Sequence, residues 1–180
     1  ATSGQQFTDW SAHYRLFKRR RVDPNVFFST TLHCTGAFLD HAAPLVALLD
    51  DTLLPKRGRH IDGAAWWRDP LGPHFQTHLI WGQRFVQCSI ALPDSGEFTP
   101  GPARAISIAF APAHKAKKPG KKATIEQHQE YEAAAHMLRI SAQGCAQMHA
   151  LRARMDADPV HAHRTLSFCV DGSYTNATVL

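Results

Sequence analysis

The feature that most constrains the fold of this chain is a pair of short, mainly apolar runs that each end in an aspartate. The first run, Leu45 to Leu49, is followed by Asp50 and Asp51, and the second, Leu166 to Val170, is followed by Asp171. Short apolar runs bounded by polar and turn-forming residues are typical of buried strands in a parallel sheet. An acid directly after such a strand lies at the carboxyl edge of the sheet, where open α/β sheets bind their ligands.

The two acids therefore predict a divalent-metal site. Neighbouring strands lie about 4.8 Å apart, and carboxylates at that spacing repel each other unless a cation is shared between them. Because successive side chains on a strand alternate faces, only one of Asp50 and Asp51 can point into the site. Each acid also has a structural alternative: Asp171 could cap a following helix, and the Asp50–Asp51 pair could be a solvated loop entry.

Length and composition indicate one globular domain with a small extension. The chain has 180 residues, of which 44% are hydrophobic and 19% charged. No stretch approaches the roughly 20 continuous apolar residues that cross a bilayer, so we expect no membrane partner. The four cysteines are scattered without a C-x-x-C pair, which argues against a zinc ribbon or a disulfide framework and for a reducing compartment.

Basic clusters and two adjacent tryptophans suggest a nucleic-acid partner. The net charge is +5, and the clusters that we predict to bind DNA are Lys56, Arg57 and Arg59, and Lys117, Lys118, Lys121 and Lys122. A solvated face is the alternative for each cluster. Trp66 and Trp67 lie in a predicted long loop from Leu54 to Gly72, either as a hydrophobic plug or as a surface on which a nucleobase stacks.

Hydrophobic spacing and turn residues predict the order helices, then β-β-β-α-β-α. The expected helices are Phe7–Arg21, Val26–Phe38, Thr124–Asp156 with a capping box at Thr124 and Gln127, and a last helix that follows a turn at Gly172–Ser173. The expected strands are Pro44–Asp51, Thr77–Leu92, Ala105–Phe110 and Leu166–Val170. A right-handed crossover lays the fourth strand parallel to the first. This order is that of an α/β, ribonuclease H-like mixed sheet, with an N-terminal helical extension (residues 1–43) before the domain (residues 44–180).

The sequence resembles insertion-sequence transposases of the DDE superfamily from about Leu45 to Leu180. The segments that carry the resemblance are Leu48–Gly58 with its Asp-Asp-Thr, the loop Gly63–Pro70, the Lys-Lys-Pro-Gly-Lys-Lys of residues 117–122, and Val170–Asn176. The resemblance implies a DNA transposase that cleaves phosphodiester bonds at the ends of an insertion element and joins the freed 3′-hydroxyl to target DNA.

The resemblance also implies residue roles and partners. Asp51 carries over as the first catalytic acid, with Asp50 as its alternative, and Asp171 as the second. These acids would bind two Mg²⁺ ions, for which Mn²⁺ can substitute. DNA would be the partner of a homodimer in a synaptic complex, in the bacterial cytoplasm at the nucleoid.

A third acid, a Glu on a later helix, should lie beyond Leu180. We therefore expect this chain to be a partial catalytic domain that lacks its C-terminal part, and to fold without catalysing. Two alternatives remain open. One is another ribonuclease H-like nuclease, which hydrolyses DNA but joins no ends, and the other is an inactive remnant that only binds DNA.

Overall fold

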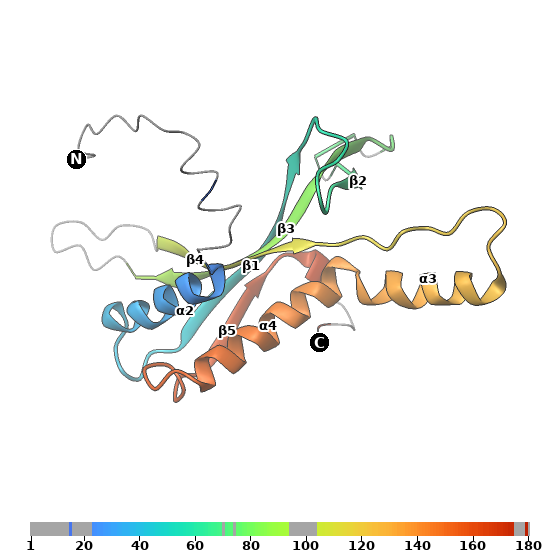
Figure 1. Ribbon diagram of the computed structural model, residues 1–180. Coiled ribbons are helices and arrows are strands. Elements are labelled where there is room, and N and C mark those ends of the chain that lie inside the picture. Colours follow the sequence, from blue (N-terminus) through green and yellow to red (C-terminus); the bar gives the residue numbers. More distant parts are fainter. Residues whose placement is uncertain are drawn as a thin grey trace.

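The structure is a computed structural model that describes residues 15, 23–69, 71–73, 75–93, 104–174 and 179. In this part of the chain, five strands and three helices form an α/β structure with one mixed sheet (Figure 1). The helices are α2 (Pro24–Thr35), α3 (Ile125–Met137) and α4 (Ile140–Asp156), with 3-10 turns η1 (Gly36–Phe38) and η2 (Gly172–Tyr174). The strands are β1 (Leu45–Pro55), β2 (Ala65–Arg68), β3 (Leu79–Leu92), β4 (Arg104–Ala113) and β5 (Leu166–Val170).

The sheet places β1 between β3 and β5. Strands β1 and β5 are parallel neighbours, with Leu45 opposite Leu166 and Leu49 opposite Val170, as the two apolar runs predicted. The other pairs are antiparallel, and β2 and β4 pair with successive parts of the long strand β3. This topology is compatible with a ribonuclease H-like fold.

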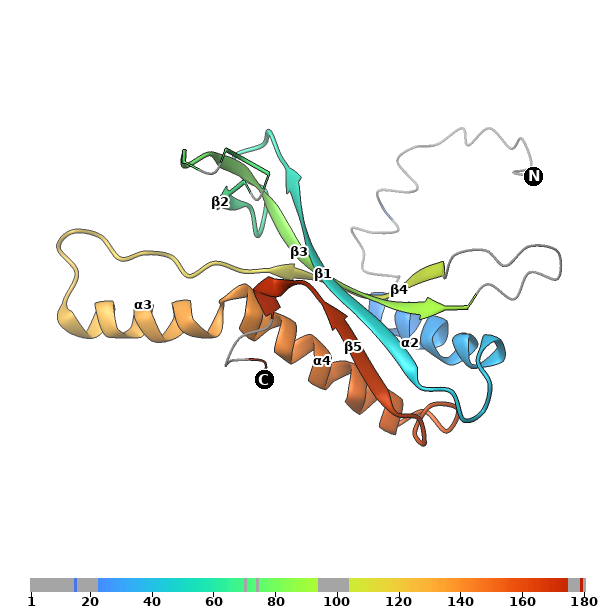
Figure 2. The same ribbon diagram turned by 180° about the vertical axis from the view of Figure 1, so that it is seen from behind.

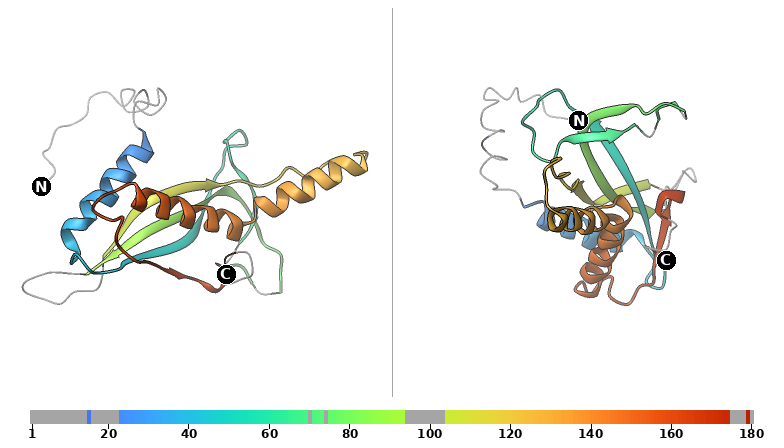
Figure 3. Two further views of the ribbon diagram at one scale, coloured as in Figure 1. Left: turned by 90° about the horizontal axis from the view of Figure 1, so that it is seen from below. Right: turned by 90° about the vertical axis from the view of Figure 1, so that its right-hand side faces the viewer.

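Helices α2 and α4 cover one face of the sheet, as seen from below in Figure 3. Every second residue of β1 points to this face, beginning with the fully buried Leu45. Leu32 of α2 and Leu151 and Met155 of α4 belong to the same core and are at most 1% exposed. Helix α2, which we assigned to the N-terminal extension, therefore contributes to the core of the sheet.

The prediction of one continuous helix from Thr124 to Asp156 is wrong. The capping box of Thr124 and Gln127 is present, but the helix ends at Met137 and restarts after Arg139, whose backbone is extended. The side-chain amide of Gln143 donates to the carbonyl of Leu138 at 2.7 Å and to that of His114 at 3.3 Å, which stabilises the break. Helix α3 has no buried residue and projects away from the sheet (Figures 1 and 2).

The segment from Leu54 to Gly72 is also not a simple loop. Strand β1 continues to Pro55, and β2 pairs with the start of β3. A strand this short has too few residues to show an alternating pattern, and pairing with β3 forms it. The expected helix Val26–Phe38 corresponds to α2 and η1, whereas Phe7–Arg21 lies outside the described residues except for Arg15. None of the described helices is long and apolar enough to cross a membrane.

Candidate functional site

Strand β1 separates its two acids onto opposite faces of the sheet. Asp51 follows the buried Leu49 by two residues, so it points to the helix-covered face, where its side chain is only 10% exposed. Asp50 is exposed, and its Oδ1 accepts a hydrogen bond from the backbone N–H of Asp51 at 2.7 Å. Of the two acids that the sequence left open, Asp51 is therefore the one on the face covered by α4.

Asp51 lies between a cation and a phenol. The Nε of Arg84, on the adjacent strand β3, donates to Oδ2 of Asp51 at 2.5 Å. The hydroxyl of Tyr174, in η2 just after β5, donates to Oδ1 of Asp51 at 3.3 Å. Tyr174 is fully buried against α4, where a Cβ on Gly144 would lie 2.4 Å from its ring. The close packing of Gly144 thus positions the phenol on the carboxylate.

Asp171, at the end of β5, also affects the pKa of the Tyr174 phenol. Burial raises the pKa of Tyr174 well above its ordinary value, and the charges of Asp51 and Asp171 raise it further. Asp171 is exposed and directly follows the last residue of β5. Asp51 does not end its strand as the sequence suggested, because β1 continues to Pro55. Strand β5 ends at Val170, opposite Leu49 of β1, and Asp51 and Asp171 both lie close enough to Tyr174 to raise its pKa.

The described residues do not by themselves form a metal-binding group. Carboxylate oxygens are the ligands that Mg²⁺ prefers. Within the described ranges, however, no group of three or more His, Cys, Asp and Glu side chains could hold an ion. One oxygen of Asp51 already pairs with the Arg84 guanidinium, which supplies the positive charge that a metal would otherwise provide.

The chain matches no family model, no curated protein and no solved structure.

The first basic cluster forms a groove with two tryptophans. A groove of about 520 Å³ is lined by Lys56, Arg57, Arg59, Trp66 and Trp81. Trp66 is 56% exposed, and its ring lies 5.7 Å from that of Trp81, measured between centroids. The Trp81 indole donates to the carbonyl of Gly58 at 2.8 Å, which attaches the basic segment to β3. Cationic groups beside exposed aromatic rings are the usual composition of a site for single-stranded nucleic acid.

The two adjacent tryptophans differ: one has the environment of a hydrophobic plug and the other that of a stacking surface. Because they are neighbours in β2, they point to opposite faces of the sheet. Trp67 is 9% exposed and its indole donates to the carbonyl of Gly82 at 3.2 Å, which is the geometry of a core residue. Trp66 presents its ring to solvent, which is the geometry of a stacking surface.

The second basic cluster lies apart from the groove of Trp66. Its residues are all exposed in the segment between β4 and α3, and they are Lys117, Lys118, Lys121 and Lys122. Lys115 in the same segment does contact β2, because its Nζ donates to the carbonyl of Trp66 at 2.8 Å.

Sequence reasoning missed Arg84, Trp81 and Tyr174. Arg84 is the one charged residue of a mainly apolar strand. A charge in such a strand usually has a specific partner, and this signal could have identified Arg84 from the sequence. Tyr174 follows Asp171 by three residues, and only the packing of η2 on α4 shows that it turns back to Asp51.

Proposed function

We propose that this chain carries two of the acids of a metal-dependent DNA phosphodiester-transfer site, of the DDE transposase type. Asp51 and Asp171 are the proposed metal ligands. The observation that supports the proposal best is the parallel pairing of β1 and β5, which brings both acids to Tyr174. When bound, the metal would supply activation of a water or of a DNA 3′-hydroxyl for in-line phosphoryl transfer.

The ion pair of Arg84 and Asp51 defines what metal binding requires. A metal ligated by Oδ2 of Asp51 has to displace the Nε of Arg84, because both cannot occupy the same position. The cost of this exchange makes the two-acid site weak. A third acid outside the described residues would offset it.

The proposed DNA contacts lie in the groove of Lys56, Arg57 and Arg59 with Trp66 and Trp81. The cations would neutralise backbone phosphates, which gives affinity without reading the sequence of the DNA. The ring of Trp66 would stack on a base of a single-stranded segment. The exposed lysines of residues 117–122 would add further phosphate contacts.

The test titrates three variants with Mn²⁺ and with Mg²⁺ and measures the binding by calorimetry. Asp51→Asn and Asp171→Asn should each abolish metal binding. Asp50→Asn is the matched control, because it removes the same charge from the opposite face one residue away and should leave metal affinity unchanged. An equal loss of metal affinity in the Asp50→Asn and Asp51→Asn variants would contradict the assignment of Asp51 as a metal ligand.

A second candidate function is DNA binding without catalysis. The observation that favours it is the pairing of Asp51 with Arg84, because the acid is then already neutralised within the fold. DNA affinity that is independent of metal and unchanged in the Asp51→Asn, Asp171→Asn double variant would support this candidate over the first. In a full-length protein, strand-transfer products would distinguish a transposase from a nuclease that only hydrolyses.

A further inference from the structure

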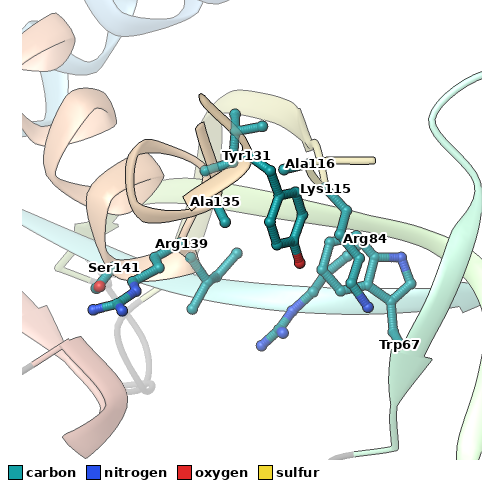
Figure 4. Close-up of a pocket in the computed structure, with 10 residues that line it drawn as sticks. Trp67, Arg84, Lys115, Ala116, Tyr131, Ala135, Arg139 and Ser141 are labelled. Carbon is teal, nitrogen blue, oxygen red and sulfur yellow. The ribbon is translucent and has the colours of Figure 1, made fainter. Parts of the chain in front are cut away.

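A second groove lies on the helix-covered side of the sheet, where the start of α4 meets β2 and β3. It has a volume of about 380 Å³, and the side chains that matter here are Trp67, Arg84, Lys115, Tyr131, Arg139 and Ser141 (Figure 4). None of these residues belongs to the groove of Trp66. The sequence did not suggest it, because its residues come from four separate segments of the chain.

The charge of this groove is positive. Arg84, Lys115 and Arg139 line it, and no acidic residue is among its described lining residues. Asp51 offsets one of the three charges through its pair with Arg84, which leaves an excess of two. Only the Nε of Arg84 is used in that hydrogen bond, so its terminal nitrogens can donate to a ligand.

Trp67 contacts two of the three cations of this groove. The Nζ of Lys115 lies 5.4 Å from the centroid of the Trp67 ring, and the guanidinium carbon of Arg84 lies 5.7 Å from it. Both distances are within the range of cation–π attraction. In Figure 4 the hydroxyl of Tyr131 points toward the end of the groove that Arg84 and Lys115 form. Cations and a hydroxyl donor thus converge beside a flat apolar ring.

Backbone N–H groups at the start of α4 add to the positive potential of the groove. Arg139 is the N-cap of α4, and its side chain makes no capping hydrogen bond, so it does not satisfy the first N–H groups of the helix. The positive end of a helix dipole favours an anion, although this contribution alone would not make a site.

We propose that this groove binds a phosphodiester of a nucleic-acid strand, with Arg84 and Lys115 as the anion-binding side chains and Arg139 at the start of α4 as a further cation. The proposal rests on the proposed function for the identity of the strand. Arg84 also contacts Asp51, so a phosphate held here would lie next to the two acids of that site. It is separate from the groove of Trp66 on the other face of β2.

The experiment follows the resonances of the Trp67 indole and the Ser141 amide in ¹H–¹⁵N spectra during titration with the dinucleotide TpT, which has one phosphodiester. We expect saturable shifts, and an affinity roughly tenfold lower in Lys115→Gln, because one charge-assisted hydrogen bond is lost. Lys122→Gln is the matched control, since it removes the same charge from an exposed turn outside the groove and should change the affinity less than twofold. Lys115→Arg should retain binding.

Three results would overturn the proposal. The first is the absence of shifts with TpT, and the second is an equal loss of affinity in Lys115→Gln and Lys122→Gln. The third is binding of thymidine monophosphate, a phosphomonoester, with no response to TpT, which would assign the groove to a free or terminal phosphate. Asp51→Asn separates this test from the metal site. It removes the acid that offsets Arg84, so TpT binding should be kept or tightened even if no metal binds to the chain.

Discussion

The Nε of Arg84 lies 2.5 Å from Oδ2 of Asp51, and the two residues reach the same face of the sheet from adjacent antiparallel strands. Both side chains are largely shielded from water, with 24% and 10% of their surfaces exposed. A half-buried pair of this kind leaves an uncompensated charge if either partner is removed. The same contact connects the proposed metal acid to the proposed phosphate groove.

The first prediction concerns this pair. Arg84→Gln and Asp51→Asn should each lower the free energy of unfolding by about 1–3 kcal/mol, because each leaves the other group without its hydrogen-bond partner. The double variant should lose no more free energy of unfolding than the less stable of the two single variants. Urea denaturation of the four proteins gives the coupling energy, and strictly additive losses would show that the contact does not stabilise the fold.

Gly144→Ala should disturb the position of Tyr174. A Cβ at residue 144 would lie 2.4 and 2.8 Å from two ring atoms of Tyr174 and 3.1 Å from a methyl carbon of Leu49. We expect a loss of about 1–3 kcal/mol in the free energy of unfolding, in spite of the better helix propensity of Ala. Gly120→Ala is the control, because nothing lies within 4 Å of a Cβ there. A Gly144→Ala protein as stable as the parent would contradict the packing of η2 on α4.

Asp158 gives a prediction for the dependence of stability on pH. Burial acts to raise its pKa, but hydrogen bonds from the Val160 N–H, at 2.9 Å, and from His33, at 3.1 Å, lower it by more, so the pKa is below its ordinary value. A lowered pKa in the folded state gives stability that is present above the unfolded pKa of about 3.9 and is lost as pH falls through the folded value.

Asp158→Ala should therefore lower the free energy of unfolding by about 1–3 kcal/mol at pH 7, because it leaves the Val160 N–H and His33 without their carboxylate partner. Thermal unfolding at a series of pH values should show this difference shrinking below about pH 3.9. Asp62→Ala, which removes an exposed carboxylate in a loop, is the control. A difference that stays constant down to pH 2 would contradict a role for the charge of Asp158.

The cysteines should differ sharply in reactivity. Burial raises the pKa of the Cys88 thiol to about 11, and this side chain is fully buried, whereas Cys34 and Cys169 are exposed. Because the thiolate is the reactive form, iodoacetamide should modify Cys34 and Cys169 in the folded protein and Cys88 only after unfolding. Mass spectrometry of peptides before and after urea treatment measures this, and modification of Cys88 at the rate of Cys34 would contradict the core placement of β3.

Local sequence patterns were sufficient for the strands that present a regular apolar face. The apolar runs Leu45–Leu49 and Leu166–Val170 predicted β1 and β5, and the crossover helix region between them predicted their parallel pairing. Strand β5 is only partly buried, because it lies at the edge of the sheet. The capping box at Thr124 was likewise readable, because its two hydrogen bonds involve residues only three positions apart. Patterns failed where the deciding contact is distant in the chain, as at the break after Leu138, which Gln143 connects to His114.

The sequence by itself predicted which two strands carry the acids, because an aspartate follows each apolar run and a right-handed crossover pairs the two runs in parallel. Only the tertiary structure decided what surrounds Asp51. Strand alternation allowed either Asp50 or Asp51 to face the helices, and the packing of α4 on Leu49 selects Asp51. Arg84 and Tyr174 lie 33 and 123 positions away from Asp51, and pairing of β3 with β1 and packing of η2 on α4 bring them to it. These contacts depend on how whole elements pack, which no periodicity along the chain encodes.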